Sequence, residues 1–215
     1  GGAIIFACLA LWNKEPLYHA DVLSRPMRIR MCFEIIGRLF YVLAVAITPL
    51  SSATAILQAT PIVVVAGAAV LFGERVGWMR WAAIVVGLIG VMIVLRPGTD
   101  AFSPLSILAV IGMLGLAGRD LASRAAPKTL STVLLGLYGF LTVIAAGGVF
   151  ALWQGRASVW PEGQVAAFIL GAICICVFAY TAFMKAMRTG EGSVVTPFRY
   201  TRLAFGVVLG GLVLC

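Results

Sequence analysis

The amino-acid sequence predicts an all-α membrane protein, built as a bundle of several membrane-spanning helices. Of its 215 residues, 62% are hydrophobic and only 11% are charged, and the mean hydropathy is +1.07. Soluble domains carry about 25% charged residues, so this chain has too few charged groups to cover a water-exposed surface. The composition therefore excludes the water-soluble enzyme classes and makes the lipid bilayer the expected surroundings of the chain.

The net charge is positive, with 16 lysines and arginines against 8 acidic residues. A basic excess can indicate nucleic-acid binding, but a solvated basic patch cannot form where most residues must face lipid. Cytoplasmic loops at an anionic membrane face explain the excess instead. We therefore expect no nucleic-acid partner.

Uncharged runs locate the spans. The longest, 39–73, covers 35 positions, which as one helix would be about 52 Å long, well beyond a hydrocarbon core of about 30 Å. It must therefore turn back, and Thr48-Pro49-Leu50-Ser51-Ser52 supplies the turn, because proline ends helices and serine caps them. Helices are expected at 1–12, 30–48, 52–72, 78–95, 104–121, 131–153, 164–187 and 193–215.

The distribution of basic residues predicts the orientation. One set of alternating loops holds only Arg96 and Arg156. The other set is expected to be cytoplasmic, because cytoplasmic loops are enriched in lysine and arginine. We therefore expect a multi-pass protein of the cell membrane, meaning the inner or plasma membrane. The eleven residues assigned to the cytoplasmic loops are Lys14, Arg25, Arg28, Arg30, Arg75, Arg80, Arg119, Arg124, Lys128, Lys185 and Arg188.

The two halves of the sequence are weakly similar when shifted by 143 positions, which aligns Pro49-Leu50-Ser51 with Gly192-Ser193-Val194. Repeats separated by an odd number of spans are inverted in the bilayer, as in many secondary transporters. Chance similarity between apolar helices is the alternative. The coincidence of turn positions as well as helices favours a repeat.

Three motifs connect the sequence to a family: Pro49-Leu50-Ser51-Ser52-Ala53-Thr54-Ala55, Thr60-Pro61-Ile62 and Leu71-Phe72-Gly73-Glu74-Arg75. They resemble the EamA repeat of the drug/metabolite transporter superfamily, and Gly190 to Tyr200 is similar to the partner repeat. The resemblance implies ten spans in two inverted five-helix repeats, of which about eight are present. Repeat 1 would be 1–98 and repeat 2 would be 99–215, so that the first and last helices are lacking.

With the resemblance, the best interpretation is a secondary transporter that moves a small organic metabolite or drug-like solute across the cytoplasmic membrane by alternating access. A non-transporting membrane scaffold or a channel-like pore is the alternative. A channel should show a polar stripe through several helices, whereas polarity here is concentrated locally. The sequence indicates no particular solute, transport direction, coupling ion or oligomeric state.

Three arginines remain inside the expected spans: Arg38, Arg199 and Arg202. Arg199 and Arg202 share a helix face at spacing i, i+3. A central arginine costs about 2.5–3.5 kcal/mol on insertion scales, so both should face protein or a watery cavity. A guanidinium fork in such a cavity suits a carboxylate or phosphate, which favours an anionic or zwitterionic solute. Snorkelling, or pairing with Glu34 or Glu191, is the alternative.

Other polar groups at depth are candidates for solute contact, because hydrogen-bonding and aromatic groups in an apolar pocket suit an amphipathic solute. Interhelical hydrogen bonding is the alternative. Pro61 and Pro197 occupy related places in the two repeats and are predicted to break helices and shape the gates, or else to form packing kinks. Glu34 and Arg38 are expected to pair at the cytoplasmic mouth. The solute-contact candidates are Tyr200, Gln58, Tyr41 and Tyr180.

Two further patterns bear on packing and chemistry. Gly112, Gly115 and Gly118 recur every three residues and predict close helix contact. His19 is the one histidine of the sequence, so we expect no histidine-based metal site or catalytic triad. We expect no enzyme activity, no bound metal and no cofactor.

Overall fold

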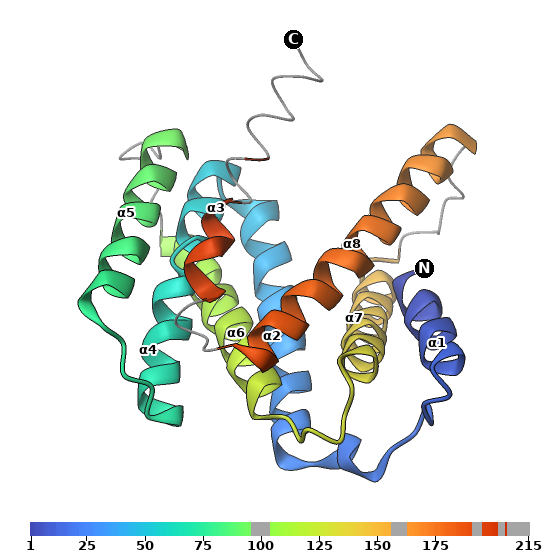
Figure 1. The fold of residues 1–215 in the computed structure, drawn as a ribbon. Coiled ribbons are helices and arrows are strands. Elements are labelled where there is room, and N and C mark those ends of the chain that lie inside the picture. The colour runs from blue at the N-terminus through green and yellow to red at the C-terminus, as the bar shows by residue number, and fades with distance from the viewer. Residues whose placement is uncertain (96–103, 156–162, 191–194, 202–204, 206–215) are drawn as a thin grey trace. The chain divides into compact units, whose positions relative to one another are not determined.

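The computed structural model describes residues 1–95, 104–155, 163–190, 195–201 and 205, and within these ranges the regular structure is helical (Figure 1). This confirms the all-α class. Three described segments are long and apolar enough to cross a membrane: Ser52–Phe72, Pro104–Ala125 and Gly163–Thr189. The helices are α1 Gly2–Trp12, α2 Arg25–Ile47, α3 Leu50–Leu57, α4 Thr60–Phe72, α5 Trp78–Leu95, α6 Ile107–Ala125, α7 Thr132–Gln154 and α8 Gly163–Thr189, with short 3₁₀ turns η1 Ala20–Leu23, η3 Pro104–Ser106 and η4 Thr196–Tyr200.

The helix expected at 52–72 is interrupted, and the interruption has a local cause. Gln58 and Ala59 separate α3 from α4. Pro61 lacks the N–H group that would donate to the Leu57 carbonyl in a continuous helix. The Thr60 hydroxyl donates to that carbonyl instead. At its other end, α4 stops at Gly73, whose left-handed φ of 66° favours glycine.

The last expected helix, 193–215, is described only at residues 195–201 and 205. Within that stretch Thr196–Tyr200 forms the 3₁₀ turn η4 rather than the start of a regular α-helix. Pro197 is among the first residues of η4 and cannot donate a backbone hydrogen bond there. Arg202 lies outside the described residues.

The chain divides into two compact units that do not follow the sequence halves. Unit 1 comprises Gly1–Ile35 and Ala122–Arg188, and unit 2 comprises Ile36–Leu121 with the described residues from Thr189 onward. Each unit therefore takes segments from both halves, and the boundaries fall within α2 and α6 and before the last residue of α8. The two sequence repeats, 1–98 and 99–215, remain a prediction.

Unit 1 is organised by the packing of α1 along α7. The Phe6 ring is fully buried, with its centroid 5.5 Å from that of Phe140 and 5.9 Å from that of Tyr180. Gly136 lies directly beneath the Phe6 ring, where an added Cβ would lie 2.5 Å from a ring carbon. Buried aliphatic side chains extend this core; among them are Met27, Leu130, Leu134, Leu135 and Val177.

Unit 2 brings α2 and α6 together at glycines. A Cβ at Gly37 would lie 2.9 Å from the Leu116 backbone nitrogen, and one at Gly112 would lie 3.0 Å from the Tyr41 backbone nitrogen. Since backbone cannot yield as a flexible side chain can, these positions need glycine. The predicted close helix contact at Gly112 is confirmed, and it positions α6 against α2.

Gly37→Ala tests this packing. The added methyl group must push α2 away from α6, and overpacking of this kind typically costs about 1–3 kcal/mol. We expect a lower Tm of the purified protein in detergent, followed by tryptophan fluorescence. Gly90→Ala is the matched control, because a Cβ at Gly90 of α5 has no neighbour within 4 Å. Equal Tm values for the two variants would contradict the close α2–α6 contact.

Candidate solute-binding site

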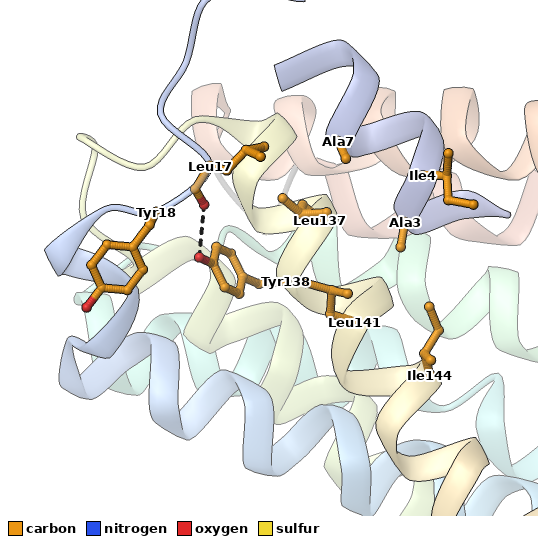
Figure 2. Close-up of a pocket in the computed structure, with 9 residues that line it drawn as sticks. All are labelled: Ala3, Ile4, Ala7, Leu17, Tyr18, Leu137, Tyr138, Leu141 and Ile144. Carbon is orange, nitrogen blue, oxygen red and sulfur yellow. Dashed lines mark hydrogen bonds between the residues drawn. The ribbon is translucent and has the colours of Figure 1, made fainter. Parts of the chain in front are cut away.

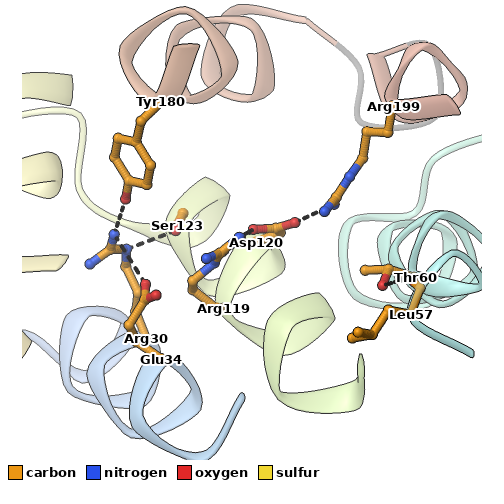
Figure 3. A network of polar contacts seen from close by, with 9 residues as sticks. All are labelled: Arg30, Glu34, Leu57, Thr60, Arg119, Asp120, Ser123, Tyr180 and Arg199. Atoms are coloured by element: carbon orange, nitrogen blue, oxygen red, sulfur yellow. Dashed lines mark hydrogen bonds and ion pairs between the residues drawn. The ribbon is translucent and has the colours of Figure 1, made fainter. Parts of the chain in front are cut away.

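A buried ionic cluster lies within unit 2, centred on Asp120 of α6 (Figure 3). The Asp120 side chain is fully buried. Arg119 donates from Nε and Nη2 to Asp120 Oδ1, at 2.9 Å and 2.7 Å. Arg199 of η4 donates from Nη1 to Asp120 Oδ2, at 2.5 Å. One carboxylate is therefore shared by two guanidinium groups.

The partners of Asp120 follow from its burial. Removing a carboxylate from water costs several kcal/mol, and the cost is offset only by well-placed counter-charges and hydrogen bonds. Both Asp120 oxygens have such donors, and donation from a charged group is roughly twice as strong as between neutral groups. The ion pair thus holds η4 at α6 within unit 2.

The turn η4 also packs against α4 and α5. The Tyr200 ring lies on Gly87 of α5, where any side chain would collide with the ring. The Tyr200 hydroxyl is buried and has no hydrogen-bond partner among the described residues. Helix α4, which η4 contacts, begins directly after the interruption at Gln58 and Ala59. Unit 2 therefore combines an interrupted helix, an ion cluster and an aromatic hydroxyl group.

A second polar cluster lies within unit 1 (Figure 3). Arg30 of α2 is fully buried. Its Nε donates to Ser123 Oγ at 2.8 Å, its Nη2 donates to the Tyr180 hydroxyl, and Nη2 lies 3.9 Å from Glu34 Oε2. The guanidinium group packs over Gly139 of α7, where an added Cβ would lie 2.8 Å from Nη2. This arginine connects α2, α6 and α8.

An apolar hollow belongs to unit 1. It has a volume of about 530 Å³ and lies between α1 and α7, with Leu17 and Tyr18 at one side (Figure 2). Tyr138 crosses it, and its hydroxyl donates to the Leu17 carbonyl at 2.9 Å. Its lining is almost wholly apolar and includes no charged residue, so it offers an acidic solute no ionic partner. The ionic cluster of unit 2 is the better candidate.

The structure brings some of the sequence-predicted residues together. Arg199 and Tyr200 both lie on η4 in unit 2, and Gln58 lies half-buried at the interruption between α3 and α4 in the same unit. Tyr180 belongs to unit 1, where it contacts Arg30 rather than Arg199. Tyr41 lies on α2 in unit 2 and packs its backbone against Gly112.

Glu34, predicted to pair with Arg38, has Arg30 as its described ion-pair partner. Glu34 is buried and forms an ion pair with Arg30, one turn earlier on α2. Arg38 is exposed on the same helix. The contact between Glu34 and Arg38 remains a prediction.

Sequence reasoning missed four residues of these clusters: Asp120, Arg119, Arg30 and Ser123. The assignment of Arg30 and Arg119 to cytoplasmic loops is wrong, because both are buried on helices, α2 and α6. Arg119 follows an uncharged run, and Arg30 lies in a charged stretch between Arg28 and Glu34. In both settings the sequence does not distinguish a loop charge from a buried one. The adjacent opposite charges of Arg119 and Asp120, within a helical pattern that continues to Ala125, could have revealed them.

Comparisons with known proteins agree with this fold. Residues 1–96 match the model of the EamA-like transporter family. A riboflavin transporter of Vibrio cholerae is 30% identical over 192 residues, which is 86% of this chain and 62% of the relative. One from Rhizobium johnstonii is 31% identical over 188 residues, 85% of this chain and 60% of the relative. An S-adenosylmethionine uptake transporter of Rickettsia prowazekii is 22% identical over 201 residues, which is 93% of this chain and 64% of the relative.

A solved structure described as "Crystal structure of protein" superposes with a TM-score of 0.80 at 18% identity, covering 98% of this chain and 75% of that chain. The fold and the apolar helices define a multi-pass membrane helix bundle. The first 96 residues match the EamA-like transporter family, as the motifs within them predicted, and the similarity to the two riboflavin transporters extends over 86% and 85% of the chain. It spans 62% and 60% of the length of the two riboflavin transporters.

Tyr180→Phe tests the unit 1 cluster. The substitution keeps the ring contacts with Phe6 and Phe140 but removes the hydroxyl that accepts from Arg30. Leaving a buried charged donor short of an acceptor costs about 1–3 kcal/mol, so we expect a lower Tm. Tyr18→Phe, which removes the same atom from an exposed ring, is the control and should leave the Tm unchanged. A Tyr180→Phe protein as stable as the control would show that the contact contributes nothing.

Proposed function

We propose that this chain forms part of a secondary transporter that moves a small organic metabolite or drug-like solute across the cytoplasmic membrane by alternating access. The observation that carries the proposal is the ion cluster of Asp120, Arg119 and Arg199, buried in an apolar helical unit beside an interrupted helix. Ionisable groups inside membrane spans are costly, and they mark substrate or ion pathways more often than they add stability.

The interrupted backbone supports the same proposal. Irregular backbone at membrane depth is tolerated where it is buried in protein or lines a cavity, and transporters build solute sites at such interruptions. The break at Gln58 and Ala59 and the 3₁₀ turn η4 are irregular segments of one unit, and η4 contacts α4. In this proposal Arg199, Tyr200 and Gln58 contact the solute, and Pro61 and Pro197 shape the gates.

The two halves, 1–98 and 99–215, are proposed to be inverted repeats. The match to the family model ends at residue 96, close to that boundary, which supports the division. The same proposal places the loops rich in lysine and arginine in the cytoplasm. It also assigns the protein no enzyme activity, which the transporter names of its relatives support.

The solute class follows from the relatives and from the site together. Riboflavin and S-adenosylmethionine, named for the relatives, both contain a planar fused heteroaromatic ring. Tyr200 offers an aromatic ring and a buried hydroxyl without a partner among the described residues, which suits such a ring. Arg199 suits an acidic group, so we propose an anionic or zwitterionic heteroaromatic metabolite.

Uptake into proteoliposomes that contain the full-length protein tests the proposal. With labelled riboflavin and labelled S-adenosylmethionine, we expect saturable uptake of at least one, accelerated when the same unlabelled solute is inside. For a solute with an acidic group, which is S-adenosylmethionine in this pair, Arg199→Gln should lower kcat/KM about tenfold to a hundredfold, as expected for one lost charged hydrogen bond. Arg28→Gln, at an exposed arginine of α2, is the control and should transport normally.

The outcomes separate the alternatives. Uptake that rises linearly with concentration and shows no counterflow would indicate a channel-like pore. Absence of uptake for both solutes and for a wider panel of metabolites would indicate a scaffold. The transporter names of the relatives favour a carrier over both.

A further inference from the structure

The two arginines at Asp120 hold it in unequal ways. Arg119 precedes Asp120 on α6, uses two nitrogens on Oδ1, and leaves 9% of its side chain exposed. Arg199 lies on the separate turn η4, uses one nitrogen on Oδ2, and leaves 24% of its side chain exposed. Arg119 is therefore the built-in partner of the carboxylate, and Arg199 is the partner on the accessible side.

This asymmetry determines which contact can open. If the Asp120–Arg199 contact opens, Asp120 keeps both donors of Arg119, so its charge does not become unpaired. Arg199 in contrast gives up the Asp120 counter-charge, and an anion in the same place is favoured because the guanidinium group lies inside an apolar unit. A solute carboxylate or phosphate supplies that replacement with the same geometry. A neutral solute does not.

We propose that Asp120 is an internal counter-ion of Arg199, which Arg199 exchanges for the carboxylate or phosphate of the solute. The inference rests on the proposed function and deepens it: Asp120 is a specificity-determining residue that keeps the site closed to solutes without an acidic group. It competes with the solute anion for one guanidinium group. Removing the competitor should therefore strengthen the binding of acidic solutes.

Matched pairs of ligands test the exchange on the full-length protein. Riboflavin and riboflavin 5′-phosphate differ by one phosphate, and their binding is followed by the quenching of flavin fluorescence. S-adenosylmethionine and its methyl ester differ by one free carboxylate, and their binding is followed by calorimetry. If the uptake assay identifies another acidic solute, that acid and its methyl ester form a third pair. The phosphate and carboxylate arms show which acidic group the site accepts.

In the wild-type protein, at least one acidic ligand should bind about tenfold or more tightly than its neutral partner. Arg199→Gln should remove this preference by weakening the acid while leaving the neutral ligand unchanged. Asp120→Asn should lower the Kd of the acid and again leave the neutral ligand unchanged. Arg28→Gln should behave as wild type. If Asp120→Asn does not fold, the wild-type preference and Arg199→Gln still decide.

The inference is overturned if acid and neutral partner bind equally to the wild type, if Arg199→Gln weakens both by the same factor, or if a folded Asp120→Asn weakens the acid. Those results would make the ion pair purely structural. Saturable uptake of a neutral solute, with no binding of any acidic partner, overturns the inference and leaves the proposed function intact. A protein that transports no solute removes both.

Discussion

The need to neutralise the buried carboxylate of Asp120 is the constraint on which unit 2 depends. A charged group that is buried away from water is costly unless the protein supplies counter-charges. A helix that carries the buried Asp120 therefore requires Arg119 beside it and Arg199 on η4. The same constraint operates at Arg30 in unit 1, where Ser123 and Tyr180 supply the acceptors and Glu34 supplies a counter-charge. In each unit the polar contacts determine which helices must be neighbours.

Irregular backbone occurs in unit 2 where a nearby side chain replaces a lost backbone hydrogen bond. Pro61 deprives the Leu57 carbonyl of its helical donor, and the Thr60 hydroxyl supplies another within one turn. The Leu57 carbonyl therefore keeps a donor in an apolar environment, as a break at membrane depth requires. Glycines have the opposite effect nearby: at Gly37 and Gly112 they let regular helices approach until backbone meets backbone. Unit 2 thus packs α2 closely against α6 and is irregular between α3 and α4 and at η4.

The comparisons separate what the family keeps from what it varies. The fold is retained at 18% identity to a solved structure, while relatives at 30% and 22% identity are named for different solutes. A fold held by apolar packing tolerates wide substitution, provided that volume and patterning are kept. Under the proposed function, solute choice resides in a small number of polar side chains. The Asp120–Arg199 pair is proposed to be one such group, since Asp120 is buried and Arg199 is partly accessible.

The sequence by itself determined the membrane class, the family resemblance and most helix bounds. Trp78–Leu95 was expected at those residues and Gly2–Trp12 within one, because hydrophobic runs and turn residues act locally. The family motifs likewise lie within short segments. Only the tertiary structure decided which charged side chains are buried and which residues they contact. The contacts join residues far apart in the sequence: Asp120 and Arg199 are 79 positions apart, and Arg30 and Tyr180 are 150 apart. A charge at the end of an apolar run reads the same in a loop as in a core, and the difference arises only when distant helices pack.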